Sequence, residues 1–531
     1  MVLVNGQLYD GTGCEPVAAD IYIRDGRIDD VRPVSDDHRG WTVVDATNDV
    51  IAPGFIDVHS HGDNGPFVAN DSWKVEQGIT TEVVGNCGTS LAPYDLASAD
   101  AFFSELVQFF PGVPRFGPRF ADALAETDRR GYVTNYAPLV GHGNLRRCVM
   151  GSHARQATSC EAARMVHLLE EALDAGAFGM STGLIYPPGM FADTDELAVL
   201  ASALGREHIF TSHMRNESDE VVRSVEEIVA IGERSGRRVH VSHHKTAGKA
   251  NWGASGRTLR TLATARARGI AITQDAYPYT AGSTTLGATL PKTYHDGGRD
   301  ATLRRLQAGS AVEELRCAIE RGEPGWENLA KSAGWSGILI VSTADHRFEG
   351  RTITELASDL ATDPVRALIY VLLEEELNAW MVVFLMDEPD IERILSDSFT
   401  SIGTDGSPAG TTGKPHPRTF GTFPRILGHY VRERRVLTLA EAIRRMTSLA
   451  ADTFGISGRG RVVAGAAADI VVLDPLTVGD DCDYRDPVRS PRGIRTVLQG
   501  GAVVVEDGRY IGGRYGKRLL PECVEPAALR P

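Results

Sequence analysis

Short apolar or β-branched segments alternate with helical patterns through the middle of this 531-residue chain, and this alternation constrains its fold more than any other feature. Strands that alternate with helices predict a parallel sheet with crossover helices. Residues 219–233, for example, place Val221, Val225 and Ile228 on one helical stripe. We count eight candidate strands, at 50–61, 80–87, 136–142, 178–185, 208–213, 238–245, 270–279 and 399–405. Eight such units predict an α/β fold of the TIM type, a (β/α)8 barrel.

The two ends of the chain differ from the middle. Short segments with the alternating pattern of β-strands, separated by turn signals, occupy residues 1–52 and occur again at 461–531. We therefore predict that the ends pair into one small β-sandwich domain beside a barrel domain at 53–460. The stretch between the last two candidate strands is too long for an ordinary loop. We expect an insertion at about 280–398 that covers the barrel mouth as a lid.

Composition narrows the class of protein. Hydrophobic residues make up 42% and charged residues 24%, as in packed globular chains. The formal net charge of −15 argues against a nucleic-acid partner, and no run approaches the ~18 apolar residues of a membrane span. The N-terminus lacks a signal-peptide pattern, and the seven cysteines are odd in number and scattered. We expect a cytoplasmic protein without disulfides or membrane attachment, and the oligomeric state stays open.

Histidines follow three of the predicted strands. His59 and His61 end the first strand, where residues i and i+2 point to the same face. His213 ends the fifth strand, and His243 lies near the end of the sixth. One such pair could be polar loop histidines, but three strand ends with histidines at one barrel mouth favour a metal site. The alternation does not decide whether His243 or His244 faces inward.

Two further polar residues lie at predicted strand ends. Cys87, between glycines after the second strand, could be a small buried residue, a nucleophile or a metal ligand. The nearby histidines favour ligation of a metal such as zinc. Asp405 follows the eighth strand and precedes a glycine, which is common for a turn residue. At this position, however, its carboxylate could take a proton from metal-bound water.

Lysine is scarce in this chain. Only seven of the 55 basic residues are Lys, and Lys74 is the single one between His61 and His213. Two-metal hydrolase barrels often bridge their ions with a carboxylated lysine from a middle strand, and no such lysine is available here. Cys87 is the residue that could replace it.

Longer motifs surround these residues. They are Pro-Gly-Phe-Ile-Asp-Val-His-Ser-His at 53–61, Gln-Gly-Ile-Thr-Thr at 77–81, Gly-Asn-Cys-Gly at 85–88, Ser-Thr-Gly-Leu-Ile-Tyr-Pro-Pro at 181–188, Ser-His-His-Lys at 242–245, Asp-Ala-Tyr-Pro-Tyr-Thr-Ala-Gly-Ser at 275–283 and His-Pro-Arg at 416–418. Through these motifs the chain resembles the N-acyl-D-amino-acid deacylase (D-aminoacylase) family of the amidohydrolase superfamily over nearly its whole length. Gly-Asn-Cys-Gly together with Ser-His-His-Lys is far more specific than the His-x-His shared across the superfamily.

The resemblance implies a zinc-dependent hydrolase that acts on small N-acyl-D-amino acids and releases the free D-amino acid. It implies one tightly held zinc on Cys87, His213 and His243, and it favours His243 over His244 because the second His varies among relatives. It also implies a weaker metal position at His59 and His61.

The resemblance further assigns roles to other residues. It implies that Asp405 is the general base and acid. The residues implied to hold the substrate α-carboxylate are Lys245, Tyr186, Tyr277 and Arg418. On sequence alone the tyrosines could equally be core aromatics and the arginine a solvated charge.

Two departures from the family pattern and three alternative functions stay open. Gly62-Asp63-Asn64 follows His61 where relatives commonly have a second acidic residue, so the weaker position is expected to bind metal poorly. Lys292 could pair with an acidic substrate side chain, although a surface charge is the simpler interpretation. The alternative functions are cyclic amide hydrolysis, deamination and a non-catalytic scaffold. Deamination is disfavoured because Asn216 stands where deaminases carry a Glu.

Overall fold

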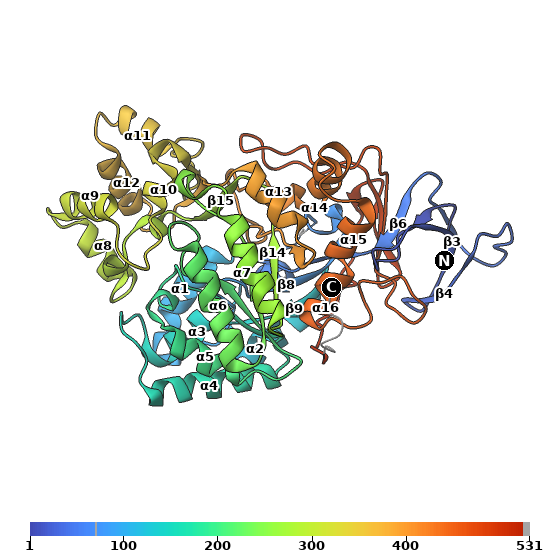
Figure 1. Cartoon of the computed structure of the whole chain (residues 1–531), viewed down its shortest axis with the longest axis horizontal. Helices are drawn as coiled ribbons and strands as arrows, with labels where there is room; N and C mark the ends of the chain where they lie inside the picture. Colours follow the sequence, from blue (N-terminus) through green and yellow to red (C-terminus); the bar gives the residue numbers. More distant parts are fainter. Residues whose placement is uncertain (70–71, 524–531) are drawn as a thin grey trace.

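The computed structural model describes residues 1–69 and 72–523 and contains a central barrel, a sheet at one end and a helical insertion beyond the barrel (Figure 1). Parallel strands form the barrel wall: β7 (Phe55–Asp57), β8 (Ile79–Val84), β9 (Asn135–Pro138) continued by β10 (Val140–Gly141), β11 (Gly179–Gly183), β12 (Ile209–His213), β13 (Arg238–Val241), β14 (Ile272–Ala276) and β18 (Thr400–Ile402). A parallel bridge between Ser60 and Gly406 joins the first strand to the last. The predicted barrel is confirmed.

Helices cover the outside of the barrel. They are α1 (Ala99–Phe109), α2 (Phe120–Arg130), α3 (His142–Met150), α4 (Ser159–Asp174), α5 (Thr194–Ser202), α6 (Val221–Ser235), α7 (Ser255–Ala267), α13 (Glu388–Ser396), α14 (Arg418–Arg425), α15 (Leu439–Met446) and α16 (Ser448–Phe454). The predicted stripe of α6 is buried, since Val221, Val225 and Ile228 are at most 2% exposed. No helix within 1–69 and 72–523 has the length and apolar character that crossing a membrane requires.

The first candidate strand is divided in two by Gly54. Residues before it form β6 (Val50–Pro53), which belongs to the end sheet, and residues after it form β7 of the barrel. A Cβ at Gly54 would lie 2.2 Å from Thr80 Oγ1. A glycine is therefore required where the chain passes closely from one sheet to the other.

Both chain ends contribute to one ten-stranded sheet. Its strand order is β22 (Arg509–Tyr510), β21 (Ala502–Glu506), β20 (Ile494–Gln499), β19 (Ile470–Leu473), β6, β2 (Gln7–Leu8), β3 (Val17–Arg24), β1 (Val2–Val4) and β5 (Val43–Asp45), with β4 (Arg27–Pro33) paired to β3. The ends meet where β6 pairs antiparallel with β19. Side chains from both ends share one hydrophobic cluster, including Leu3, Ile21 and Ile470. The predicted pairing of the two ends is therefore present, and residues 524–531 of the predicted C-terminal part lie outside the described residues.

The insertion begins directly after β14 and has its own sheet and helices. An antiparallel sheet in the order β15 (Ala281–Thr285), β17 (Trp380–Phe384) and β16 (Ile338–Ser342) is joined to α8 (Arg299–Leu306), α9 (Ala311–Arg321), α10 (Leu329–Ala333), α11 (Ile353–Asp359) and α12 (Pro364–Glu374). Its helices lie away from the end sheet, on the opposite side of the barrel (Figure 1). Residues of β15 and β17 line the cavity at the barrel mouth, as expected for a covering segment.

Asp469, just before β19, joins the end sheet to the barrel. Its Oδ1 accepts hydrogen bonds from the backbone N–H of Gly500 and from Gln499 Nε2, both in the sheet region. Its Oδ2 accepts hydrogen bonds from Asn135 Nδ2 of β9 and from Arg459 Nε, each at 2.9 Å. The buried Asp469 carboxylate therefore holds the end sheet and the barrel together, because its four hydrogen-bond donors compensate for the hydration that it loses on burial.

We expect Asp469→Ala to lower the free energy of unfolding by about 3–5 kcal/mol, because it leaves the charge of Arg459 without its carboxylate partner and removes the acceptor shared by the sheet and the barrel. Glu506→Ala, at an exposed position of the same sheet, is the control and should change stability by less than about 0.5 kcal/mol. Thermal or denaturant unfolding measures both. Equal free energies of unfolding of the two variants would contradict the role of Asp469 in holding the end sheet to the barrel.

Candidate metal centre and substrate cavity

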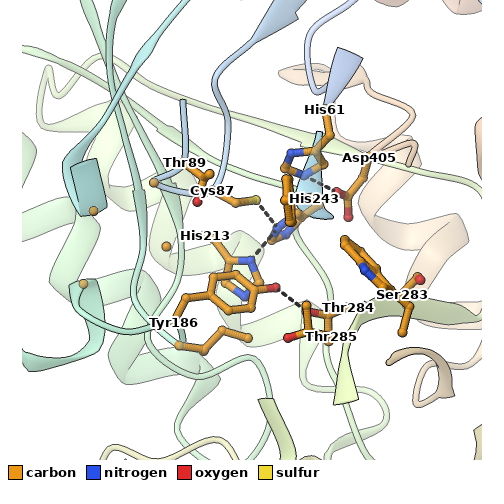
Figure 2. Close-up of a pocket in the computed structure, with 18 of the residues that line it drawn as sticks. His61, Cys87, Thr89, Tyr186, His213, His243, Ser283, Thr284, Thr285 and Asp405 are labelled. Carbon is orange, nitrogen blue, oxygen red and sulfur yellow. Dashed lines mark hydrogen bonds and ion pairs between the residues drawn. The ribbon is translucent and has the colours of Figure 1, made fainter. Parts of the chain in front are cut away.

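The polar residues predicted from strand ends converge at the barrel mouth (Figure 2). Those at or just after the carboxyl ends of β7, β8, β12, β13 and β18 are His59, His61, Cys87, His213, His243 and Asp405. All are buried, and all except His59 line a cavity of about 310 Å³. The location agrees with the general rule that the sites of such barrels lie at the carboxyl ends of the strands.

Three of these residues have a left-handed backbone. The φ angles are 53° at Cys87, 35° at His243 and 47° at Asp405. Residues with a Cβ rarely adopt this conformation, and it costs on the order of 1–3 kcal/mol per residue. The strain falls on residues from three different strands that meet in one cavity, as is typical of functional sites.

Two overlapping groups of donor atoms share Cys87. In the first, His243 Nε2 lies 3.4 Å from Cys87 Sγ and 2.9 Å from His213 Nδ1. In the second, His59 Nε2 lies 3.3 Å from Cys87 Sγ, while His61 Nε2 lies 3.2 Å from Asp405 Oδ1. The donor atoms within each group all lie within 4.8 Å of one another. One ion could be held by each group, with Cys87 common to both.

The protonation of Cys87 fits a metal ligand. Burial alone would raise the pKa of its thiol, but the neighbouring His59 and His243 outweigh burial and hold the pKa well below its usual range. The group is therefore a thiolate, which is the form that binds metals. A thiolate with imidazoles is a donor set that suits zinc, and a protein ligand set of three leaves room for water or substrate.

The structure distinguishes the two adjacent histidines of the sixth strand. His243 belongs to the donor group, whereas His244 points away and its Nδ1 lies 2.6 Å from Gln274 Oε1. Burial lowers the pKa of His244 to about 4, so it is a neutral residue.

Asp405 lies between the histidines and Arg418. Its Oδ2 is 2.7 Å from Arg418 Nη1, and its Oδ1 is 3.6 Å from His59 Nε2. Burial alone would raise the pKa of Asp405, but Arg418 and His243 hold it well below its usual range. The carboxylate is therefore ionised and able to accept a proton.

Cations and an aromatic ring border the same side of the cavity. Arg418 Cζ lies 4.5 Å and Lys245 Nζ 5.5 Å from the ring centroid of Tyr277. All three line the cavity. Tyr186 is placed differently, because its hydroxyl is 2.9 Å from Thr284 Oγ1 and its ring packs against His213.

Sequence reasoning missed three buried acidic residues around these groups. Glu217 accepts hydrogen bonds from Lys245 Nζ at 2.8 and 2.9 Å and lies 3.1 Å from His243 Nδ1. Asp275 Oδ2 lies 3.3 Å from His59 Nδ1, and its Oδ1 accepts the backbone N–H of His243. Each therefore orients a histidine from behind, which is a known way to fix a metal-ligating imidazole.

Signals for two of these acids were present in the sequence. Glu217 follows His213 by four residues, one position after Asn216, and Asp275 stands at a strand end. The third, Glu327, comes from the insertion, and no sequence pattern places it here. Its Oε1 accepts the backbone N–H of Glu217. Burial, reinforced by Glu217, raises the pKa of Glu327 to about 8.

A buried ion pair connects the first and last barrel strands beneath the site. Asp57 Oδ2 accepts hydrogen bonds from Lys74 Nζ at 2.5 Å and from Thr404 Oγ1 at 2.7 Å. Asp57 Oδ1 accepts the backbone N–H groups of His59 and Thr404. Lys74 is thus held in an ion pair with Asp57, and it does not line the cavity in the described structure.

Two other residues that the sequence singled out lie outside the donor groups and the cavity lining in the described structure. Among the residues described, the cavity lining does not include Lys292, which lies near Arg215 and Glu220. Asp63 is buried but belongs to neither donor group in residues 1–69 and 72–523.

We expect iodoacetamide to alkylate Cys87 of the metal-free protein at pH 6 faster than it alkylates Cys148 or Cys482. Burial raises the pKa of each of those two thiols to about 12, so they remain protonated. Added Zn²⁺ should protect Cys87. Peptide mass spectrometry measures the labelling, and rates for Cys87 no higher than for the other two would contradict the thiolate.

Comparison with known proteins identifies the family. Residues 42–505 match the model of the amidohydrolase family. The D-aminoacylase of Alcaligenes xylosoxydans xylosoxydans is 37% identical over 98% of this chain and 97% of its own, and the N-acyl-D-glutamate deacylase of the same organism is 36% identical over 95% and 93%.

A solved structure supports the same assignment. The N-acyl-D-glutamate deacylase of Bordetella bronchiseptica, complexed with zinc and a phosphonate mimic of the tetrahedral intermediate, is 35% identical. It covers 98% of both chains with a TM-score of 0.80. With the barrel, the end sheet and the Cys-His centre in place, this chain belongs to the amidohydrolase family and, within it, to the D-aminoacylase and N-acyl-D-amino-acid deacylase family.

Proposed function

We propose that the protein hydrolyses the amide bond of N-acyl-D-amino acids in a zinc-dependent reaction, giving a carboxylate and a free D-amino acid. The observation that carries the proposal is the Cys87 thiolate among four histidines, with the ionised Asp405 beside it. The D-aminoacylase and N-acyl-D-glutamate deacylase activities of the relatives support the linear amide and the D enantiomer.

Zinc would be held tightly by Cys87, His213 and His243, and a second, weaker position would use His59 and His61. When bound, zinc supplies a Lewis acid that polarises the amide carbonyl and lowers the pKa of a coordinated water to about 7. In a D-aminoacylase of solved structure, one metal activates the enzyme and a second metal attenuates it. This relative supports unequal roles for the two metal positions.

Asp405 moves the protons in the proposed reaction. As an ionised carboxylate beside His61, it takes a proton from the attacking water at Oδ1. The protonated Asp405 then donates to the amide nitrogen as the C–N bond breaks, so that the D-amino acid leaves as a neutral amine. Its 2.7 Å contact with Arg418 keeps the carboxylate ionised before substrate arrives.

The substrate α-carboxylate would bind near Lys245, Tyr277 and Arg418. These groups offer cationic donors on one side of the cavity, which would fix the amino-acid half relative to the reacting carbon. Tyr186, on the His213 side, is proposed to contact the substrate through its hydroxyl. These assignments are our proposal for the substrate site.

The cavity favours an apolar D-amino acid over an acidic one. Each cation in its lining already has a carboxylate partner: Lys245 pairs with Glu217, Arg418 with Asp405 and Arg147 with Glu105. Apolar lining residues from the insertion are Leu329, Trp380, Val383 and Leu385. Since Lys292 does not line the cavity in the described structure, a second substrate carboxylate would have no dedicated partner.

Cyclic amide hydrolysis and deamination are not proposed. Lys245, the lysine that lines the cavity in the described structure, is in an ion pair with Glu217 and is not placed as a carboxylated bridge. A scaffold without catalysis is disfavoured because all the predicted ligands are present and close together.

We also propose a cytoplasmic location and the division of the chain into 1–52, 53–460 and 461–531. All seven cysteines are free in the described structure, which supports a reducing compartment. The change from end sheet to barrel at Gly54 supports the first boundary.

Asp405→Asn is expected to retain zinc and to lower kcat by ~10² or more, because the amide cannot accept the proton. Metal content by elemental analysis and turnover of N-acetyl-D-leucine give the two readings. Near-normal kcat would exclude Asp405 as the base, while loss of zinc would assign it a ligand role instead.

A matched panel of N-acetyl-D- and N-acetyl-L-amino acids tests the function itself. We expect hydrolysis of the D-leucine and D-phenylalanine derivatives, much slower hydrolysis of the D-glutamate derivative and none of the L series. A chelator should abolish the activity, and Zn²⁺ should restore it. Preference for the L series, or activity that resists chelation and metal removal, would refute the proposed function.

A further inference from the structure

The cavity of the metal centre has an aromatic end. We give this name to four residues of its lining, which are Phe102, Leu106 and Phe109 of α1 and Trp380 of β17. Phe102 and Leu106 are buried, whereas Phe109 and Trp380 remain partly exposed. Removal of exposed apolar surface from water is favourable, so an apolar ligand that covers these two rings gains binding energy.

The spacing of residues in α1 explains why the helix turns an apolar side toward the cavity. Phe102, Leu106 and Phe109 follow one another at i, i+4 and i+7, so they lie on one stripe of the helix. At the end of the stripe, the ring of Phe109 packs edge-on against His61, with centroids 6.0 Å apart. The ring of Trp380 lies 5.3 Å from that of Phe109. The aromatic end therefore starts beside the metal centre and is shared between α1 and the insertion.

Strands β15 and β17 show where the aromatic end lies relative to the proposed carboxylate site. Val383 pairs with Gly282, and a Cβ at Gly282 would lie 3.4 Å from Tyr277 Oη. Trp380 pairs with Thr285, further along the same two strands. Since each residue advances about 3.3 Å along a strand, the three residues from Val383 to Trp380 span about 10 Å. Tyr277 and the aromatic end therefore lie at different ends of the cavity.

An N-acyl amino acid has its parts in a matching order. The α-carboxylate and the side chain are both attached to the α-carbon, and the amide nitrogen separates them from the carbonyl and the acyl group. With the carboxylate near Lys245, Tyr277 and Arg418 and the carbonyl at the metal centre, the acyl group continues away from the carboxylate. It therefore extends toward the aromatic end, while the amino-acid side chain stays near the carboxylate.

The charged groups beside the α1 stripe already have partners. Glu105 Oε2 lies 2.5 Å from Arg147 Nη1, and the side chains of Glu105 and Arg147 are 40% and 36% exposed. Both line the cavity, at positions that water reaches. A charged acyl group would therefore meet a neutralised pair, whereas an apolar acyl group would cover the exposed rings of Phe109 and Trp380.

We propose that the aromatic end binds the acyl group of the substrate and selects apolar acyl groups longer than acetyl, such as pentanoyl. This inference rests on the proposed function. In the reaction, water adds to the carbonyl carbon and the C–N bond breaks. The water oxygen stays with the released carboxylic acid, and a proton is transferred to the nitrogen of the D-amino acid. The acyl chain itself is bound and not altered.

The first test varies the acyl group on a constant D-leucine, with the zinc-loaded enzyme. The substrates are N-acetyl-, N-pentanoyl- and N-(3-methoxypropanoyl)-D-leucine, the last being a polar isostere of the second. We expect kcat/KM for pentanoyl to exceed that for acetyl by about tenfold or more, since each buried methylene contributes about fourfold. The ether should lose most of this gain because its oxygen would be buried without a donor. Equal values for pentanoyl and acetyl, or for pentanoyl and the ether, would overturn the proposal.

Variants of the two exposed rings locate the acyl group. Phe109→Ala and Trp380→Ala should each lower the ratio of kcat/KM for pentanoyl over acetyl by about tenfold, because the covered ring is removed. Each ratio comes from one protein preparation, so loss of folded or zinc-loaded enzyme cancels from it. Val107→Ala, at a position of α1 that is 41% exposed, is the control and should leave the ratio unchanged. Unchanged ratios in both ring variants would refute the assignment.

The same variants show whether the aromatic end takes the acyl group or the amino-acid side chain. The ratio of kcat/KM for N-acetyl-D-leucine over N-acetyl-D-alanine reports the side chain. We expect Phe109→Ala and Trp380→Ala to change this ratio by less than about twofold, because the side chain stays near the carboxylate. If this ratio falls while the pentanoyl-to-acetyl ratio stays constant, the aromatic end holds the side chain and the proposal is wrong.

Binding distinguishes failure of this inference from failure of the proposed function. Isothermal titration of zinc-loaded Asp405→Asn with N-pentanoyl- and N-acetyl-D-leucine measures affinity without turnover. We expect a Kd about tenfold lower for the pentanoyl compound, a difference that is lost in Asp405→Asn/Phe109→Ala. If the wild type hydrolyses neither compound but this difference holds, the reaction is wrong and the acyl assignment stands. If acetyl turnover is normal and the two Kd values are equal, the acyl assignment is wrong.

Discussion

Closure of the barrel between β7 and β18 is the constraint on which the centre depends. Asp57 accepts hydrogen bonds from the backbone of both His59 and Thr404 and from Lys74, so the first and last strands meet around one buried carboxylate. That closure brings His61 within 3.2 Å of Asp405, although 344 residues separate them in the chain. An unclosed sheet of the same strands would leave His59 and His61 at one edge and Asp405 at the other.

Charge compensation explains how so many ionisable groups can be buried in one place. Glu217 balances Lys245 and orients His243, while Asp275 lies against His59 and also against His240, at 2.8 Å. Burial of an isolated charge costs several kcal/mol, whereas a paired and hydrogen-bonded charge recovers much of that cost. The acids behind the histidines therefore serve stability and geometry together, and they leave the imidazole nitrogens on the cavity side for a metal.

The sequence predicted those features that are local or periodic. Strand alternation located the barrel, and the strand-end rule located Cys87 and Asp405. Three features could not be obtained in this way. Glycine at 54 ends one sheet and starts another through a close contact with Thr80, which pattern does not reveal. The face of His243 depends on its left-handed backbone rather than on alternation. Glu327 reaches the site through the folding of the insertion, which has no periodic relation to the barrel.

Reactive and selective parts of this molecule occupy different stretches of chain. The donor atoms come from barrel strand ends, whereas Trp380, Val383 and Leu385 come from residues 280–398 and border the space for the variable parts of a substrate. This stretch enters after β14 and returns before β18, with its own three-stranded sheet. This single contiguous segment could therefore be exchanged between relatives during evolution. Such an exchange would change which substrate side chains and acyl groups are preferred, while each metal ligand and the base stay the same.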